Sequence, residues 1–579
     1  MNIFLAQQNY LIGDFEGNLK KIITGVESVK KQHADLIVFS ELSVCGYPPR
    51  DFLEFEDFIR QCEESIEKLK PYSKDMAILV GAPCRNPVPE GKDLFNAAWF
   101  LFDGKVQQIV HKTCLPTYDI FDEYRYFEPA FDWKIIEFKG KKLAVTICED
   151  IWNLGDDPLY RICPMDKLME QQPDVMINIS ASPFDYDQSE KRSAVIQANV
   201  QKYRLPMYYC NTVGSQTEMV FDGGSMIVDA SGKVKKSLTL FKEEITGYDL
   251  NELVHTSSGP ESPFIRTGKE SPKNAVHLAT GNMPALTMSQ HSRLPYDPER
   301  HTDRIYDALV MSIHDYFYKM KFTRAIVGSS GGIDSAVALS LACAALGNEN
   351  VHAVMMPSPF SSDHSVNDAV QLSKNLGNPY DIIPINEIYQ SFLHTLKPQF
   401  HDLPFNVTEE NIQARTRGNI LMSLANKFSY ILLNTSNKSE LSTGYGTLYG
   451  DMAGGLSVLG DVYKTQMYAL ASYINRNKEI IPENILHKAP SAELRPDQKD
   501  SDSLPEYEVL DPVLYQYIEH RQGPQEIIAQ GYEENLVKRI LKLVNTNEYK
   551  RNQFCPIIRV SCKAFGAGRR VPIVGKYLS

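Results

Sequence analysis

A glycine-rich loop between two apolar segments is the feature that most constrains the fold of this chain. Residues 325–328 are typical of a strand, residues 336–346 are typical of a helix, and the loop joins them directly. Glycines let the backbone turn tightly and present bare N–H groups, while a helix start adds a partial positive charge that favours an anion. The pattern predicts an α/β unit with a cradle for the pyrophosphate of a nucleotide. The residues of this cradle are Gly328, Ser329, Ser330, Gly331, Gly332, Ile333, Asp334 and Ser335.

Composition narrows the classes of partner. The chain has 579 residues, a formal net charge of −12 and ten cysteines. An acidic chain argues against a nucleic-acid surface, which needs clustered Lys and Arg, and favours small-molecule substrates. The cysteines form no CxxC pair, so we expect a cytoplasmic protein without a disulfide framework or structural zinc. No apolar run approaches the roughly 20 residues that span a bilayer, so we expect no membrane partner.

Strand-like runs alternate with amphipathic stretches up to about residue 250, which predicts α/β structure. Asp103-Gly104 and Lys139-Gly140 each separate two such runs, so hairpins and mixed sheets are expected. The predicted strands are 3–7, 36–39, 77–80, 143–147, 175–179, 207–210 and 226–228.

The chain is predicted to divide into two domains. Residues 256–290 are rich in Ser and Pro and lack periodicity, which indicates a linker or connecting arm. The first domain is then 1–255 and the second is 291–579, which opens with a helical pattern at 297–320.

Three reactive side chains follow predicted strands of the first domain: Glu41, Lys112 and Cys148. Strand ends of α/β folds collect catalytic groups. A Lys ammonium lowers the pKa of a nearby thiol, and a Glu can take and return its proton, so the three would form a working set. Taken singly, a cysteine in the position of Cys148 is more often a buried small hydrophobe, and the other two are more often solvated charges at strand ends.

The sequence segments around these residues resemble the signature segments of the nitrilase-type amidases. The segments are 40–42 with 46–49, 112–116 and 148–152. The resemblance implies a four-layer αββα sandwich, Cys148 as nucleophile, Glu41 as general base and acid, and Lys112 at the oxyanion. It also implies a further catalytic Glu123 and glutamine contacts by Tyr118 and Ser182. An arginine found shortly after the Ser182 position in some relatives is replaced by Gln188, with Lys191 and Arg192 further on.

The SGGxDS loop resembles that of the N-type ATP pyrophosphatases, which belong to the adenine nucleotide alpha hydrolase-like folds with a mainly parallel sheet. These enzymes split ATP between the α and β phosphates, and Asp334 would hold Mg²⁺ beside the departing pyrophosphate. A glycine-rich turn capped by Asp and Ser is the plain structural alternative.

Three more segments, 410–418, 434–451 and 488–494, resemble the ammonia-channelling NAD synthetases. With the nitrilase-like domain, the resemblance to glutamine-dependent NAD synthetases covers nearly the whole chain. It places Glu440 with Asp334 on magnesium. It implies ATP contacts by Thr435, Lys464 and Ser491, and contacts to nicotinic acid adenine dinucleotide by Asn411, Arg417 and Asp451. The Gln-x-Asp-Glu segment of the family appears as residues 498–501 without its Glu.

The implied reaction is the last step of NAD biosynthesis. The dinucleotide carboxylate is adenylated by ATP with loss of pyrophosphate, and ammonia from glutamine then displaces AMP. The resemblance also implies a homo-oligomer, a dimer or a larger assembly. Three alternatives stay open: a nitrilase-like hydrolase with a regulatory nucleotide site, a synthetase that amidates another acyl-adenylate such as one of xanthylate or aspartate, and a non-enzymatic scaffold.

Overall fold

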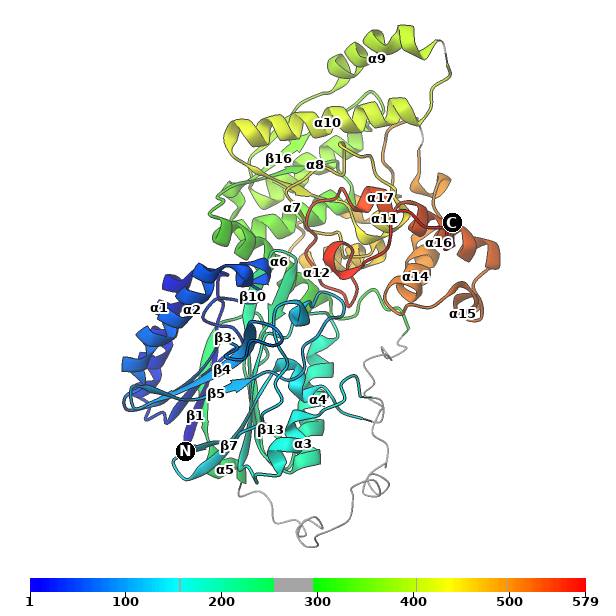
Figure 1. Ribbon diagram of the computed structural model, residues 1–579. Coiled ribbons are helices and arrows are strands. Elements are labelled where there is room, and N and C mark those ends of the chain that lie inside the picture. The colour runs from blue at the N-terminus through cyan, green and yellow to red at the C-terminus, as the bar shows by residue number, and fades with distance from the viewer. Residues whose placement is uncertain (156–157, 255–294, 402, 497, 579) are drawn as a thin grey trace. The chain divides into compact units, whose positions relative to one another are not determined.

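The computed structural model describes residues 1–155, 158–254, 295–401, 403–496 and 498–578 (Figure 1). The chain forms two compact units. The first contains Met1–Ser182, Ser189–Val213 and Phe221–Arg293, and the second contains Pro183–Gln188, Gly214–Val220 and Leu294–Ser579. The predicted linker at 256–290 lies outside the described residues.

Two six-stranded sheets form the centre of the first unit. Their apolar faces share one buried core, and β1 packs against β9 within it. In spatial order the first sheet comprises β14 (Glu244–Asp249), β1 (Asn2–Gln7), β2 (Leu36–Phe39), β3 (Ala77–Arg85), β4 (Leu94–Phe102) and β5 (Lys105–His111). The second comprises β13 (Val234–Ser237), β12 (Met226–Val228), β9 (Met207–Asn211), β8 (Val175–Ser180), β7 (Lys141–Ile147) and β6 (Ile136–Phe138).

Helices cover the outer face of each sheet, which confirms the predicted αββα sandwich (Figure 1). The first sheet carries α1 (Phe15–Lys30) and α2 (Glu56–Leu69), and the second carries α3 (Pro164–Met169) and α4 (Gln188–Tyr203). Helix α5 (Leu250–Val254) also belongs to the first unit. The strands β10 (Val213–Gln216) and β11 (Met219–Asp222) pair with each other, and most of this pair belongs to the second unit.

Both predicted hairpins are present because their turn residues adopt left-handed backbone conformations. Asp103 and Gly104 have φ of 53° and 69° between β4 and β5, and Lys139 and Gly140 have 48° and 71° between β6 and β7. These conformations suit two-residue turns that match the twist of the strands. The inner strands β1, β2 and β3 are parallel, as are β7, β8 and β9, so their carboxyl ends gather at one edge of each sheet.

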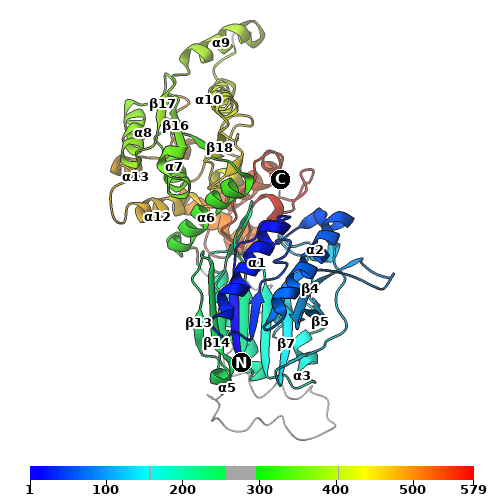
Figure 2. The same ribbon diagram turned by 90° about the vertical axis from the view of Figure 1, so that its left-hand side faces the viewer.

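A five-stranded parallel sheet forms the centre of the second unit, as predicted (Figure 2). Its spatial order is β17 (Tyr380–Ile382), β16 (Val351–Met355), β15 (Ala325–Gly328), β18 (Ile431–Asn434) and β19 (Leu456–Ser457). Its helices are α6 (Thr302–Met320), α7 (Ile333–Leu346), α8 (Asp363–Leu376), α9 (Asn386–Phe400), α10 (Val407–Phe428), α11 (Lys438–Thr443), α12 (Lys464–Ile474), α13 (Glu483–His487), α14 (Tyr507–Ile518), α15 (Pro524–Ile528), α16 (Glu534–Thr546) and α17 (Glu548–Arg551).

The helix predicted at 297–320 starts later than expected. His301 has a left-handed φ of 55°, so α6 begins at Thr302. The loop after β15 leads into α7 as the sequence predicts, and α7 and α10 both pack on the sheet. Among the described residues, no helix is both long and apolar enough to cross a membrane.

Gly81 of β3 allows the loop that follows β2 to lie against the sheet. A methyl group at Gly81 would lie 2.3 Å from the amide nitrogen of Leu42 and 2.6 Å from the carbonyl oxygen of Ser40. We therefore expect Gly81→Ala to lower the free energy of unfolding by about 2 kcal/mol or more, since the backbone must shift. Gly140→Ala, which meets no neighbouring atom, is the control and should cost about 1 kcal/mol through its positive φ. Calorimetry measures both, and equal losses would contradict this role of Gly81.

Candidate active sites

The first unit brings the predicted Glu41, Lys112 and Cys148 to the carboxyl ends of β2, β5 and β7. The ammonium of Lys112 is fully buried and lies 2.7 Å from Oε1 of Glu41 and 2.8 Å from both carboxylate oxygens of Glu123. Burial alone lowers the pKa of Lys112, but Glu123 and Glu41 together hold that pKa well above its usual range. Lys112 is therefore a fixed positive charge.

Further donors orient the two carboxylates. The side-chain amide of Asn96 donates to Glu41 at 2.7 Å, and the backbone amide of Ala181 donates to its other oxygen at 2.9 Å. The hydroxyl of Tyr47 donates to Glu123 at 2.8 Å, and burial raises the pKa of Glu123 to about 6. Sequence analysis gave no role to Asn96 or Tyr47. Asn96 stands in no segment with an evident chemical pattern, whereas Tyr47 lies in the segment 46–49 that carries the resemblance.

Cys148 starts a short 3₁₀ turn, Cys148–Ile151, with a left-handed φ of 44°. Asp150 fixes this turn, because its carboxylate accepts the amides of Ile147 at 3.0 Å and of Cys114 at 2.8 Å. We expected Lys112 to lower the pKa of the Cys148 thiol. Lys112 does act in that direction, but burial and the charge of Glu41 outweigh it and raise that pKa. The resting thiol is therefore protonated at neutral pH.

Glu149 is a further buried carboxylate beside the thiol, which sequence analysis missed although it follows Cys148 directly. The hydroxyl of Tyr118 donates to both of its oxygens at 3.0 Å, and that of Tyr160 donates at 3.3 Å. Burial raises the pKa of Glu149 to about 8. Tyr118 therefore lies at the Cys148 site, where its hydroxyl is hydrogen-bonded to Glu149.

Ser182 and Arg192 are both buried. The amide of Ser182 donates to Oδ1 of Asn211 at 2.9 Å. Arg192 forms two hydrogen bonds with Asp222, at 2.9 and 2.7 Å. This buried ion pair fixes the guanidinium group of Arg192 against Asp222 in the protein interior.

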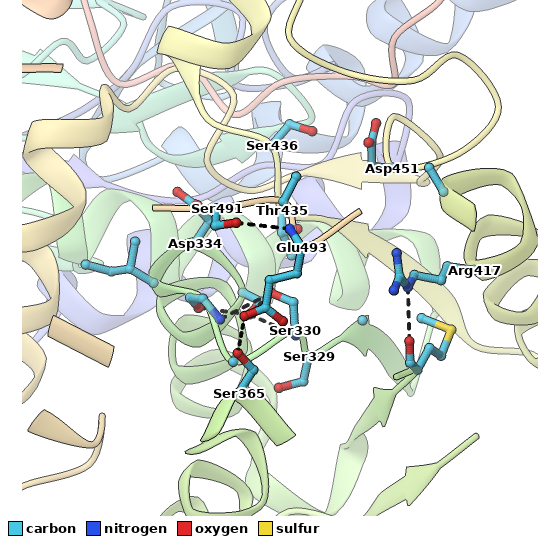
Figure 3. A pocket seen from close by; sticks show the side chains of 18 of the residues that line it. Ser329, Ser330, Asp334, Ser365, Arg417, Thr435, Ser436, Asp451, Ser491 and Glu493 are labelled. Carbon is cyan, nitrogen blue, oxygen red and sulfur yellow. Dashed lines mark hydrogen bonds between the residues drawn. The ribbon is translucent and has the colours of Figure 1, made fainter. Parts of the chain in front are cut away.

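In the second unit, the glycine-rich loop lines a cavity of about 300 Å³ (Figure 3). Gly331 has a φ of 78°, and a methyl group there would lie 2.1 Å from the carbonyl oxygen of Ser365. Ser335 shapes the loop, because its hydroxyl accepts the amide of Ser330 at 3.2 Å and donates to the carbonyl of Gly332 at 2.9 Å. All eight predicted cradle residues line this cavity.

The two predicted magnesium ligands share one lysine. The ammonium of Lys464 lies 2.5 Å from Asp334 and 3.6 Å from Glu440. Asn437 joins the acids, since its side chain donates to Asp334 and accepts the amide of Glu440, both at 3.0 Å. Burial and the charge of Asp334 raise the pKa of Glu440 to about 8. Asp500 also lines the cavity and interacts electrostatically with Lys464, so the segment that lacks the family Glu still supplies one carboxylate.

Thr435, Ser491, Arg417 and Asp451 also line the cavity. Figure 3 shows Arg417 and Asp451 away from Asp334 in this view. Arg417 donates to the carbonyl of Met356 at 3.0 Å, and burial lowers its pKa to about 10.

The other predicted dinucleotide contacts meet at Thr447. Asn411 lies inside α10 and accepts a hydrogen bond from the hydroxyl of Thr447 at 2.7 Å. Asp451 accepts the amide of Thr447 at 2.6 Å. Thr447 therefore ties Asn411 to the segment that carries Asp451.

Comparisons with known proteins match both units. The family model for carbon-nitrogen hydrolases matches residues 3–256, and that for NAD synthase matches residues 305–554. The chain is thus a carbon-nitrogen hydrolase unit joined to an NAD synthase unit. The glutamine-dependent NAD(+) synthetase of Synechocystis sp. is 42% identical over 583 residues, which cover 99% of this chain and 98% of that relative.

A second relative and a solved structure are also glutamine-dependent NAD synthetases. The glutamine-dependent NAD(+) synthetase of Thermotoga maritima is 40% identical, over 100% of this chain and 99% of that relative. The structure of glutamine-dependent NAD+ synthetase from Acinetobacter baumannii in complex with ADP is 35% identical, with a TM-score of 0.72 over 99% of this chain and 98% of that chain. The chain belongs to the family of glutamine-dependent NAD(+) synthetases.

The raised pKa of Glu149 predicts a pH dependence of stability. Its folded pKa of about 8 lies above the unfolded value of about 4.3, so the folded state binds more protons between these values. The free energy of unfolding therefore falls as the pH rises from 5 to 8. We expect Glu149→Gln to reduce this fall, by on the order of 2 kcal/mol, in melting curves at several pH values. Glu137→Gln, at an exposed site, should leave the fall unchanged, and parallel curves for both variants would contradict the assignment.

Proposed function

We propose that the chain makes NAD from nicotinic acid adenine dinucleotide, using ATP and the amide nitrogen of glutamine. The observation that carries this proposal is the presence, in one chain, of a buried Glu-Lys-Cys set and a nucleotide cradle lined by two neighbouring carboxylates. Family membership over the full length supports it. The products are NAD, glutamate, AMP and pyrophosphate.

Glutamine hydrolysis begins at Cys148. Glu41 takes the thiol proton as sulfur attacks the side-chain amide, and the Lys112 ammonium stabilises the tetrahedral oxyanion. The proton passes from Glu41 to the departing ammonia, which leaves a thioester, and water then releases glutamate and restores the thiol. The buried donors on Glu41 support this role, since they hold its carboxylate in one orientation.

Glu149 is suited to the ammonium group of glutamine. A buried carboxylate whose pKa is about 8 gains most from a cation that replaces its proton. Tyr118 then contributes in two ways: its hydroxyl orients Glu149 through a hydrogen bond, and its ring contacts the glutamine. Since Asp222 holds Arg192, we assign the glutamine carboxylate to hydrogen-bond donors near Ser182 and not to this arginine.

In the second unit the dinucleotide carboxylate attacks the α-phosphorus of ATP. Oxide is too poor a leaving group for ammonia to displace directly, whereas AMP leaves readily from the mixed anhydride. The cradle residues 328–335 hold the departing pyrophosphate, assisted by Thr435, Lys464 and Ser491. Asn411, Arg417 and Asp451 hold the dinucleotide.

The residues present fit Mg²⁺. Asp334 and Glu440 both approach the Lys464 ammonium. Burial and the charge of Asp334 raise the pKa of Glu440, and a hard cation that binds there would take the place of its proton. Mg²⁺ is commonly held by one or two carboxylates plus substrate phosphates, and it would neutralise charge that develops on the phosphates. Asp334 and Glu440 would be its protein ligands.

We also propose a cytoplasmic homo-oligomer. Exposed apolar side chains occur along α9 and α10 and in the segment between them, where a partner surface would cover apolar area. They are Ile388, Phe392, Leu403, Phe405, Val407 and Phe428. A second copy would cover them, and light scattering should give at least twice the chain mass of 65.5 kDa. A mass of one chain at micromolar concentration would contradict the assembly.

Two substitutions should separate the half-reactions. Cys148→Ala removes the nucleophile and should lower glutamine-dependent NAD formation by about a thousandfold or more, while ammonium still supports synthesis. Asp334→Asn should give the opposite profile, with synthesis lost for both nitrogen donors and glutamine hydrolysis retained.

The assay mixes protein, dinucleotide, ATP, Mg²⁺ and either glutamine or ammonium, and measures NAD, AMP and pyrophosphate. A nitrilase-like hydrolase with a regulatory nucleotide site would make no AMP. A synthetase for another acyl-adenylate would make AMP only with its own acid. NAD formation from glutamine by Cys148→Ala would remove this residue from its role.

A further inference from the structure

A buried ion cluster in the second unit is not used by any step above. The ammonium of Lys438 lies 2.9 Å from Asp461, 2.8 Å from Glu519 and 2.8 Å from the hydroxyl of Ser561. Lys438, Asp461 and Glu519 are at most 1% exposed. Buried ion pairs contribute little net stability relative to apolar packing, so stability alone is a weak explanation for the cluster.

The cluster supports the carboxylates of the nucleotide site. Lys438 is the first residue of α11, and Asn437 before it is the N-cap that contacts both Asp334 and Glu440. Ser439, the next residue, accepts the backbone amide of Lys464 at 2.9 Å. A shift of Lys438 would therefore displace Asp334, Glu440 and Lys464 together.

The same cluster also contacts the segment that directly follows Ser182 in the chain. Residues Pro183–Gln188 belong to the second unit. The hydroxyl of Tyr186 donates to Oε2 of Glu519 at 2.8 Å, while Oε1 of that carboxylate accepts from Lys438. The amide of Tyr186 donates to the carbonyl of Val560 at 3.0 Å. Glu519 thus joins the first turn of α11 to a segment that starts one residue after a predicted glutamine contact.

We infer that Tyr186 is a positioning residue that couples the nucleotide site to glutamine hydrolysis through Glu519 and Lys438. This inference rests on the proposed function. ATP and dinucleotide bring negative charge to Asp334 and Glu440, and the response of α11 passes through Glu519 to Tyr186 and along four residues of backbone to Ser182. A contiguous, buried network with each contact satisfied is the kind of path that carries such coupling.

The test is Tyr186→Phe, which removes one hydroxyl. Glutamate release is measured with and without saturating ATP, Mg²⁺ and dinucleotide, beside ammonium-dependent NAD synthesis. We expect the nucleotides to accelerate glutamate release in the unsubstituted protein, and Tyr186→Phe to reduce this acceleration about fivefold or more. Hydrolysis without nucleotides and ammonium-dependent synthesis should each stay within about twofold, because a single coupling contact is removed.

Tyr517→Phe is the matched control. Tyr517 lies on α14 of the same unit and donates its hydroxyl to Asn545 at 3.0 Å, with no contact to residues 183–188 among those described. It should keep the full acceleration. Glu519→Gln, which keeps the shape of the side chain, is the second variant and should uncouple in the same way if Tyr186→Phe unfolds.

Three results would overturn the inference: equal acceleration in Tyr186→Phe and the unsubstituted protein, no acceleration in the unsubstituted protein, or a parallel loss of ammonium-dependent synthesis. The last result would mean that the contact is only structural. Failure of the proposed function is distinguishable, because the unsubstituted protein would then make no NAD from ammonium.

Discussion

A buried lysine shared by two carboxylates is the interaction on which both units depend. Lys112 lies between Glu41 and Glu123, Lys464 between Asp334 and Glu440, and Lys438 between Asp461 and Glu519. These three lysines are at most 4% exposed. An isolated buried charge is very costly, so each ammonium requires its acids, and each acid fixes the strand end or helix start that carries it. The arrangement fixes the positions of reactive groups inside the protein.

Each lysine has two carboxylates beside it, so the carboxylates outnumber the ammonium groups at each of these places. This excess of acidic groups contributes to the chemistry of each site. Around Lys112, burial and the charge of Glu41 keep the Cys148 thiol protonated until Glu41 removes the proton, which makes the nucleophile depend on a correctly placed base. Around Lys464, burial and the charge of Asp334 raise the pKa of Glu440 to about 8, and the pair of carboxylates favours a divalent cation. Around Lys438, the second oxygen of Glu519 accepts a hydrogen bond from a tyrosine hydroxyl. One motif thus serves acid-base chemistry, cation binding and positioning.

Much of this could be predicted from the sequence. Strand patterns predicted β2 and β15 with their observed bounds, the turn dipeptides predicted both hairpins, and Glu41, Lys112 and Cys148 follow strands of the mixed sheets as expected. The sequence pattern did not reveal Asn96, Glu149 or Lys438, because their roles arise from contacts between residues far apart in the chain or from the depth at which a carboxyl is buried. The helix start at Thr302 was displaced by a left-handed residue that no local pattern indicated.

The central claim is that nitrogen freed at Cys148 is consumed at a carboxylate activated by AMP. Mass spectrometry of one reaction tests it most directly, with nicotinic acid adenine dinucleotide labelled by oxygen-18 in its carboxylate and glutamine labelled by nitrogen-15 in its amide. The account predicts one oxygen-18 in AMP, one in the NAD carboxamide, and nitrogen-15 in the same carboxamide. Oxygen-18 in orthophosphate together with ADP, or NAD formed while AMP carries no label, would contradict it.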